Sequence, residues 1–181
     1  FGSGEAFPST IDLADLNGSN GFEIVGEFTG DIAGVPVGPA GDVNGDGFDD
    51  LLIGAGYYNN KGGRSYIVFG KSQWSAASLD LFWMVDSEGV WFDGESVFSM
   101  AGGINAAGDV NGDGYDDLMI GAPGFNGAAG AAYVVFGSST LGGVFRLADL
   151  TTSTGFRLDG IDAGDQVGFF LNSAGDFNGD G

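Results

Sequence analysis

The amino-acid sequence predicts an all-β repeat fold, and three observations support that prediction. An acidic motif recurs every 67 residues: GDVNGDGFDD at 41–50, GDVNGDGYDD at 108–117 and a shortened GDFNGDG at 175–181. Apolar runs of strand length, rich in Val, Ile, Phe and Tyr, are bounded by Gly, Asn, Asp or Pro. No stretch sustains the apolar period of a helix. A fixed period implies that each repeat is one structural unit, which stacks on its neighbours.

The order of the expected strands is clearest in the second repeat. An Ala- and Gly-rich strand at 104–110 leads into the acidic loop, and DLMIGAP at 117–123 follows it. Further strands are expected at the end of 127–137, in VFRLADL and in GFRLDG, with a turn or 3₁₀ piece at Leu147–Leu150. The first repeat gives the corresponding runs PVGPAGDV, DLLIGAGYY, RSYIVFG, LFWMV and VWFDG. Each run is about as long as a strand.

Four antiparallel strands in a repeat of about 67 residues are typical of a β-propeller blade. The strand rich in Gly and Ala suits the crowded innermost position of a blade. Propellers close with about 4–8 blades, so the chain is expected to be an incomplete propeller or repeat array. It would then belong to a longer polypeptide or assemble with copies of itself. The expected units are the outer strand of a preceding blade at 1–35, complete blades at 36–97 and 98–164, and the first strand and shortened loop of a third blade at 165–181.

The composition excludes several classes of function. Five Lys and Arg against 25 Asp and Glu give a formal net charge of −20, which excludes nucleic acid and anionic membrane as partners. The chain has no Cys and no His, so disulfides, thiolate zinc sites and the usual general base are absent from the sequence. No apolar run has transmembrane length, and no direct membrane insertion is expected. A folded domain with this charge repels itself, and bound divalent cations would offset the repulsion.

The acidic motifs have the spacing of calcium loops. Oxygen-bearing positions alternate along each motif, and a chain that curls around an ion presents every second residue to it. A glycine directly after the third of these positions allows the sharp bend that such a loop needs. Oxygen ligands without nitrogen or sulfur favour Ca²⁺ over Zn²⁺ or Cu²⁺, and a flexible cage favours Ca²⁺ over Mg²⁺. The expected ligands are Asp42, Asn44, Asp46, the Phe48 carbonyl and Asp50; Asp109, Asn111, Asp113, the Tyr115 carbonyl and Asp117; and Asp176, Asn178 and Asp180 in the shortened third motif.

Two other interpretations of these motifs are weaker. An EF-hand would end its loop with Glu, but Ile53 and Ile120 occupy that position and a strand-like run replaces the exiting helix. Asp, Asn and Gly also favour ordinary turns, yet the fixed period of the motif favours a metal. Asp49 and Asp116 are expected outside the coordination sphere, facing solvent or supporting the ligands.

The stretch DVNGDGYDDLMIGAP followed by YVVFG resembles the FG-GAP repeat of integrin α-subunit propellers and of bacterial secreted proteins. The resemblance covers essentially the whole chain and implies a β-propeller, with Ca²⁺ in the loop between the first and second strands of a blade. It points to the same ligands in the two complete loops. The sequence departs from the family pattern in two respects: GAP is intact only at 121–123, and the Phe-Gly pair expected ahead of each loop is missing.

Catalysis is not expected. The clustered carboxylates recur with the repeat, whereas catalytic sites are usually single, and Ser or Thr would lack an activating His. The Gly-rich stretch 121–132 is followed by neither a helix nor Lys, so it does not predict a phosphate loop. An aromatic group could stack on carbohydrate, although packing in the core or between blades is the favoured interpretation. Its members are Trp74, Phe82, Trp83, Trp91 and Phe92.

The sequence therefore predicts a calcium-binding extracellular module for interaction or adhesion, secreted or at the cell surface, in which Ca²⁺ is structural. Its partner would be a protein or carbohydrate ligand at the cell surface. One alternative is a structural subunit of an extracellular fibre or surface layer, built from copies of the chain. A second is a non-catalytic propeller appended to a secreted hydrolase.

Overall fold

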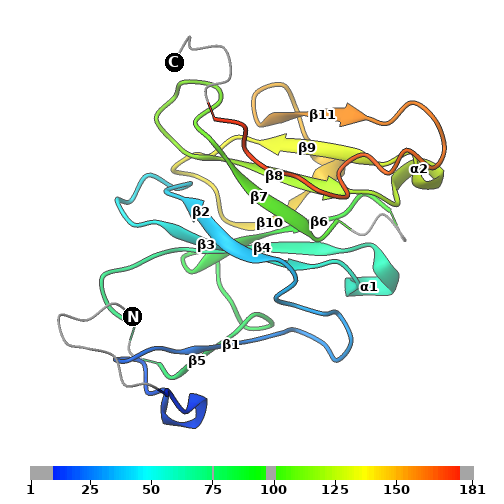
Figure 1. Ribbon diagram of the computed structural model, residues 1–181. Coiled ribbons are helices and arrows are strands. Elements are labelled where there is room, and N and C mark those ends of the chain that lie inside the picture. The colour runs from blue at the N-terminus through cyan, green and yellow to red at the C-terminus, as the bar shows by residue number, and fades with distance from the viewer. Residues whose placement is uncertain (1–9, 75, 97–100, 176–181) are drawn as a thin grey trace.

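The computed structural model describes residues 10–74, 76–96 and 101–175 and contains three β-sheets, one above another in Figure 1. The outermost is a two-stranded sheet of β1 (Glu23–Val25) and β5 (Ser78–Asp80). The central sheet has the order β10-β6-β4-β3-β2, and the third has the order β11-β9-β8-β7. The strands of these two sheets are β2 (Val37–Gly41), β3 (Asp50–Ala55), β4 (Arg64–Val68), β6 (Gly89–Asp93), β10 (Gly143–Arg146), β7 (Gly103–Gly108), β8 (Asp117–Ala122), β9 (Ala131–Val135) and β11 (Gly155–Asp159).

Each of the two larger sheets contains four antiparallel strands in chain order, β2-β3-β4-β6 and β7-β8-β9-β11. This pattern confirms the predicted all-β class and fits blades of an incomplete propeller. The glycine- and alanine-rich strands β2 and β7 form corresponding edges of the two sheets and lie against each other. The chain thus places its smallest side chains where two blades approach most closely.

The apolar runs are long because the central sheet is buried on both faces. On β3, Leu52 packs into the core shared with the third sheet, whereas Ile53 packs toward the two-stranded sheet. Ile67 and Tyr66 on β4 divide in the same way. Because successive side chains of a strand point to opposite faces, continuous hydrophobicity here fills two cores.

A fifth, parallel strand joins the central sheet, which the four-strand prediction did not include. β10 comes from the second repeat, yet it pairs with β6 of the first. β5 of the first repeat pairs in the same parallel way with β1, the strand before it. Each repeat therefore donates one short strand to the sheet that precedes it.

The prediction of a strand at LFWMV is wrong. Pairing stops at Asp80, whose carboxylate accepts a hydrogen bond from the Phe82 amide at 2.9 Å, while its carbonyl accepts one from the Trp83 amide at 3.0 Å. These bonds turn the chain, so that Leu81 and Met84 are buried and Phe82 and Trp83 face outward. The residues expected as a turn in the second repeat do form a 3₁₀ turn, η2 (Leu147–Asp149), matched by η1 (Leu13–Asp15) near the amino terminus.

Two four-residue helical segments, α1 (Tyr58–Lys61) and α2 (Phe125–Ala128), follow β3 and β8, and each contains an asparagine with positive φ, Asn59 and Asn126. Both are too short for the apolar periodicity of a helix to appear in the sequence. No helix in the described part of the chain has the length and apolar character needed to cross a membrane.

Candidate functional site

The two acidic motifs form loops at equivalent places, one between β2 and β3 and the other between β7 and β8. A shift in strand register precedes each loop, between Pro39 and Gly41 in the first and between Ala106 and Gly108 in the second. Three glycines in each loop have positive φ, at positions 41, 45 and 47 and at 108, 112 and 114. These backbone angles are readily available only to glycine, which explains the glycine content of the motif.

Within the first loop, the Asp42 carboxylate organises the backbone. Its Oδ1 accepts hydrogen bonds from the amides of Gly45 at 2.8 Å and Asp46 at 3.0 Å, and its Oδ2 accepts one from Gly47 at 2.9 Å. Asn44 Oδ1 also accepts from the Asp46 amide, and Asp46 Oδ1 accepts from the Phe48 amide, both at 2.9 Å. The alternating side chains therefore hold the loop backbone in one tight turn.

The second loop repeats every one of these hydrogen bonds. Asp109 accepts from the amides of residues 112, 113 and 114 at 2.8, 3.1 and 2.9 Å. Asn111 Oδ1 accepts from the Asp113 amide at 2.9 Å, and Asp113 Oδ1 accepts from the Tyr115 amide at 3.0 Å. In both loops the Asn side-chain amide donates to the following Asp, from Asn44 to Asp46 at 3.1 Å and from Asn111 to Asp113 at 2.8 Å.

The closing aspartates Asp50 and Asp117 are buried. Each holds the loop to the body of its blade: Asp50 accepts from the amides of Val43 at 3.0 Å and Gly70 at 2.8 Å. Asp117 accepts from the amides of residues 110 and 137, both at 2.8 Å. Burial raises the pKa of Asp50 to about 6, although the two backbone hydrogen bonds lower it, and burial likewise raises the pKa of Asp117. Among the described side chains, no Lys or Arg forms an ion pair with either.

Both loops bring together the residues that the sequence nominated, but their carboxylates do not converge on a common point. In residues 10–74, 76–96 and 101–175, no three or more acidic side chains form a group that could hold a metal ion as arranged. They accept hydrogen bonds from loop amides instead. The donor set still fits a hard cation, because it consists of carboxylate, amide and carbonyl oxygens and a carboxylate oxygen that accepts one hydrogen bond keeps a free lone pair. Asp176, Asn178 and Asp180 lie outside the described residues.

Asp116 connects the two loops. Its carboxylate accepts a hydrogen bond from the Asp42 amide at 2.9 Å, and its own amide donates to the Asp42 carbonyl at 3.2 Å. The Tyr115 ring lies against Gly45, where an added Cβ would overlap it. Asp116 therefore supports a predicted ligand of the neighbouring blade. Its repeat equivalent Asp49 is exposed and has no such contact with a described residue.

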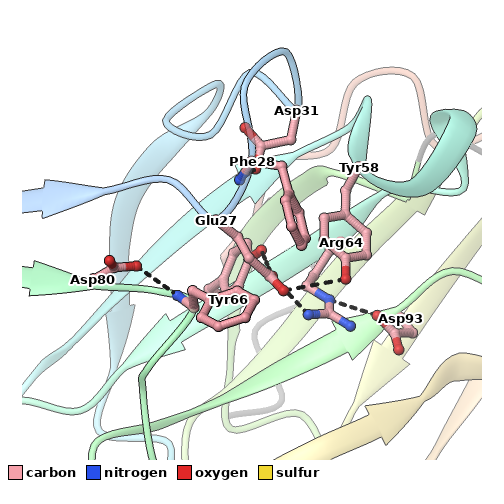
Figure 2. Close-up of polar contacts among 9 residues, drawn as sticks. Glu27, Phe28, Asp31, Tyr58, Arg64, Tyr66, Asp80 and Asp93 are labelled. Atoms are coloured by element: carbon pink, nitrogen blue, oxygen red, sulfur yellow. Dashed lines mark hydrogen bonds and ion pairs between the residues drawn. The ribbon is translucent and has the colours of Figure 1, made fainter.

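A second contact between blades centres on Glu27, which follows β1 (Figure 2). Its carboxylate lies 2.8 Å from Arg64 Nη1 and accepts a hydrogen bond from the Tyr66 hydroxyl at 2.8 Å. Arg64 also pairs with Asp93 at 2.6 Å and stacks on the Tyr58 ring, 4.1 Å from its centroid. Burial alone would lower the pKa of Arg64, but Asp93 and Glu27 raise it above its usual value. None of the site residues predicted from the sequence belongs to this cluster.

The repeat itself carries a signal for that cluster. Glu95 and Tyr133 occupy in the second repeat the positions of Glu27 and Tyr66 in the first. Glu95 pairs with Arg157 at 2.6 Å, and Arg157 also lies 2.6 Å from Asp159. Burial, and then the charge of Glu95, raises the pKa of Tyr133. A Glu after the outer strand of one blade thus faces a buried Tyr on the third strand of the next.

The aromatic residues singled out in the sequence do not form one group. Phe92 is in the core, as the packing interpretation predicts, and Trp74 stacks on Phe22 with ring centroids 4.1 Å apart. Phe82 and Trp83 are exposed, so the packing interpretation is wrong for these two. Their rings meet edge to face at 4.7 Å, because the turn at Asp80 directs both outward.

Stacked sheets, each with four antiparallel strands in chain order and an acidic loop between the first and second of them, define a class of propeller-type repeats. The family model described as FG-GAP repeat matches residues 37–68 and 101–135, which contain both complete loops. The chain is an FG-GAP repeat protein, similar to integrin α subunits.

Integrin alpha-PS2 of Drosophila melanogaster is 35% identical over 135 residues, which cover 70% of this chain and 9% of the relative. Integrin alpha-3 of Mus musculus is 35% identical over 109 residues, covering 58% and 9%. Phosphatidylinositol-glycan-specific phospholipase D of Bos taurus is 31% identical over 147 residues, covering 77% and 16%. The chain thus spans less than a fifth of the length of these relatives.

Proposed function

We propose that this chain is a Ca²⁺-stabilised interaction module of an extracellular or cell-surface protein, in which the ions are structural and no reaction is catalysed. The similarity to integrin α subunits supports adhesion and a protein or carbohydrate ligand at the cell surface. The phospholipase D relative supports the alternative of a propeller attached to a hydrolase. In both cases the blades serve as a scaffold.

The observation that carries the calcium proposal is the pair of loops with matching hydrogen bonds, each closed by a buried carboxylate. Asp50 and Asp117 are buried, and each lies near two further carboxylates of its own loop. Among the described residues, no Lys or Arg forms an ion pair with either of them. A buried carboxylate is costly unless it is neutralised or paired. A hard divalent cation would neutralise it and draw the alternating oxygens of the loop together.

In the proposed complex, the first ion is held by Asp42, Asn44, Asp46, the Phe48 carbonyl and Asp50. The second is held by Asp109, Asn111, Asp113, the Tyr115 carbonyl and Asp117. Asn44 and Asn111 would supply their side-chain amide oxygens to the ion, while their amide nitrogens donate to Asp46 and Asp113. Each bound ion then fixes the connection between the first two strands of its blade.

Thermal unfolding with and without Ca²⁺ tests this function. An ion at about 100 times its dissociation constant stabilises a folded protein by about 2.7 kcal/mol. For a chain of this size, that corresponds to a rise in Tm of about 5–10 °C for each site. Mg²⁺ at the same concentration serves as the control and should give a smaller rise. Equal Tm values in Ca²⁺ and in EGTA would contradict the proposal.

A further inference from the structure

Backbone groups at the start of the first acidic loop are held by residues of the second blade. The Asp42 amide donates to the Asp116 carboxylate at 2.9 Å, and the Asp42 carbonyl accepts a hydrogen bond from the Asp116 amide at 3.2 Å. The carbonyl of the next residue, Val43, accepts one from the Ser138 amide at 2.9 Å. Val43 lies between two predicted ligands, Asp42 and Asn44. The second blade therefore positions the backbone from which these two ligands extend.

The residues that make these contacts are joined to predicted ligands of the second loop. Asp116 stands between Tyr115 and Asp117, both of which are predicted ligands. Ser138 follows Gly137, whose amide donates to the Asp117 carboxylate at 2.8 Å. Gly137 is buried between the two loops, and an added Cβ there would overlap a backbone oxygen of each. The two loops are thus packed together at the points where their ligands are held.

A continuous path of hydrogen bonds links the buried carboxylates that close the two loops. Asp117 accepts from the Gly137 amide, and the next amide in the chain, that of Ser138, donates to the Val43 carbonyl. Val43 in turn donates its own amide to Asp50 at 3.0 Å. Asp50 and Asp117 are 3% and 0% exposed, and Val43 is fully buried. A displacement of either carboxylate is therefore transmitted through buried backbone.

We propose that the two loops bind Ca²⁺ cooperatively, and that Asp116 and the segment 137–138 are positioning groups that couple them. This inference rests on the proposed calcium function and adds to it a dependence of each site on the other. Once the second loop holds an ion, its ligands on either side of Asp116 are fixed, and so are the groups that position Asp42 and Val43. The first loop is then partly ordered before its own ion binds. An ordered site loses less conformational entropy on binding, so the second ion binds more tightly than the first.

Repulsion between the two bound ions acts in the opposite direction. Salt screens this repulsion, with a Debye length of about 8 Å at physiological ionic strength. The hydrogen bonds from Gly137 to Asp117 and from Val43 to Asp50 are buried, and buried interactions are screened much less. Favourable coupling should therefore persist or increase when the salt concentration is raised.

Calcium titrations followed by NMR measure the loops separately, because the backbone amides of Gly47 and Gly114 give one signal in each. Asp113→Asn removes a charged ligand from the second loop but keeps an acceptor oxygen, and Asp46→Asn does the same in the first. The hydrogen bonds of both side chains with described residues stay within their own loops. We expect the first loop to bind Ca²⁺ at least about fivefold more weakly in Asp113→Asn than in the wild type. Because coupling is reciprocal, the second loop should weaken by a similar factor in Asp46→Asn.

Two uncoupling variants test the positioning groups. Ser138→Pro removes the amide that donates to Val43, and Asp116→Ala removes the carboxylate that holds the Asp42 amide. Each should reduce the coupling factor severalfold, while each loop still binds one ion. Ser138→Ala keeps the backbone amide and should couple like the wild type, as should Lys71→Pro at the equivalent position of the first repeat. Circular dichroism establishes that each variant is folded, and Asp116→Ala carries the test where Ser138→Pro does not fold.

The outcomes separate this inference from the calcium function. Two ions that bind independently in the wild type would overturn the inference, and so would coupling that survives unchanged in the folded uncoupling variants. Both loops would still bind Ca²⁺ in either case, so the proposed function would stand. A wild type that binds no Ca²⁺ would contradict the proposed function and the inference together.

Discussion

Asp116 offers a sharp test of how neighbouring calcium loops support each other. Asp116→Ala removes the acceptor of the Asp42 amide, a contact of 2.9 Å between two blades. Asp42 in turn accepts three loop amides, so a shift in its backbone would disturb the whole first loop. The second loop has no equivalent support from a described residue.

The expected loss follows from the type of hydrogen bond. A bond to a charged acceptor contributes about 1.5–3 kcal/mol, and this one is half-buried, so a loss of about 1.5–2 kcal/mol is expected. For a chain of this size, that corresponds to a fall in Tm of about 3–8 °C. Asp116→Asn keeps an acceptor oxygen and should lose less. In calcium titrations, Asp116→Ala should weaken the first loop more than the second.

Thermal unfolding in EGTA, followed by circular dichroism, measures the loss of stability. Asp49→Ala is the matched control, because Asp49 has the same place in the first loop and is exposed. Surface substitutions of that kind usually change stability by no more than about 0.5 kcal/mol. Equal stability of the Asp116→Ala and Asp49→Ala proteins would refute the role assigned to Asp116.

Two further predictions also compare equivalent positions in the two repeats. Gly41→Ala should destabilise the protein more than Gly108→Ala in urea unfolding. Both residues have positive φ, but an added Cβ at Gly41 would strike the Asp116 carboxylate, whereas nothing lies within 4 Å of an added Cβ at Gly108. Equal losses of stability in the two variants would contradict this prediction. Glu27→Ala should lower the free energy of unfolding by about 3 kcal/mol, because it leaves the buried Arg64 with Asp93 as its one ion-pair partner. Glu95→Ala should cost less, because its partner Arg157 is more exposed. A loss below about 1 kcal/mol for Glu27→Ala in the same assay would show that this cluster is not a stabilising contact.

The order of the four antiparallel strands in each blade could be predicted from the sequence. The 67-residue repeat gives the period of the blades, and buried strands appear as apolar runs. Leu52 and Ile53, for example, belong to one apolar run and fill opposite cores. The local hydrogen bonds of each loop also follow from local chemistry, since Asp42 and Asp109 bind amides only three to five residues away.

Contacts between repeats could not be predicted from the sequence, because they depend on how neighbouring blades stack and on which of their surfaces then meet. The pairing of β10 with β6 across the repeat boundary is one case, and the bond from Asp116 to the Asp42 amide, 74 residues away in the chain, is another. The turn at LFWMV was missed for a related reason. An apolar run suggests a strand, but the side chain of Asp80 caps the backbone and ends the pairing.

The most direct test of the calcium-loop account is a count of bound ions by equilibrium titration of the wild type, Asp50→Asn and Asp117→Asn. The alternating-oxygen loops predict two calcium ions bound at the complete loops, and each substitution should abolish binding at its own loop only. Either variant retaining the full wild-type stoichiometry and affinity, or a wild type that binds no calcium, would contradict the account.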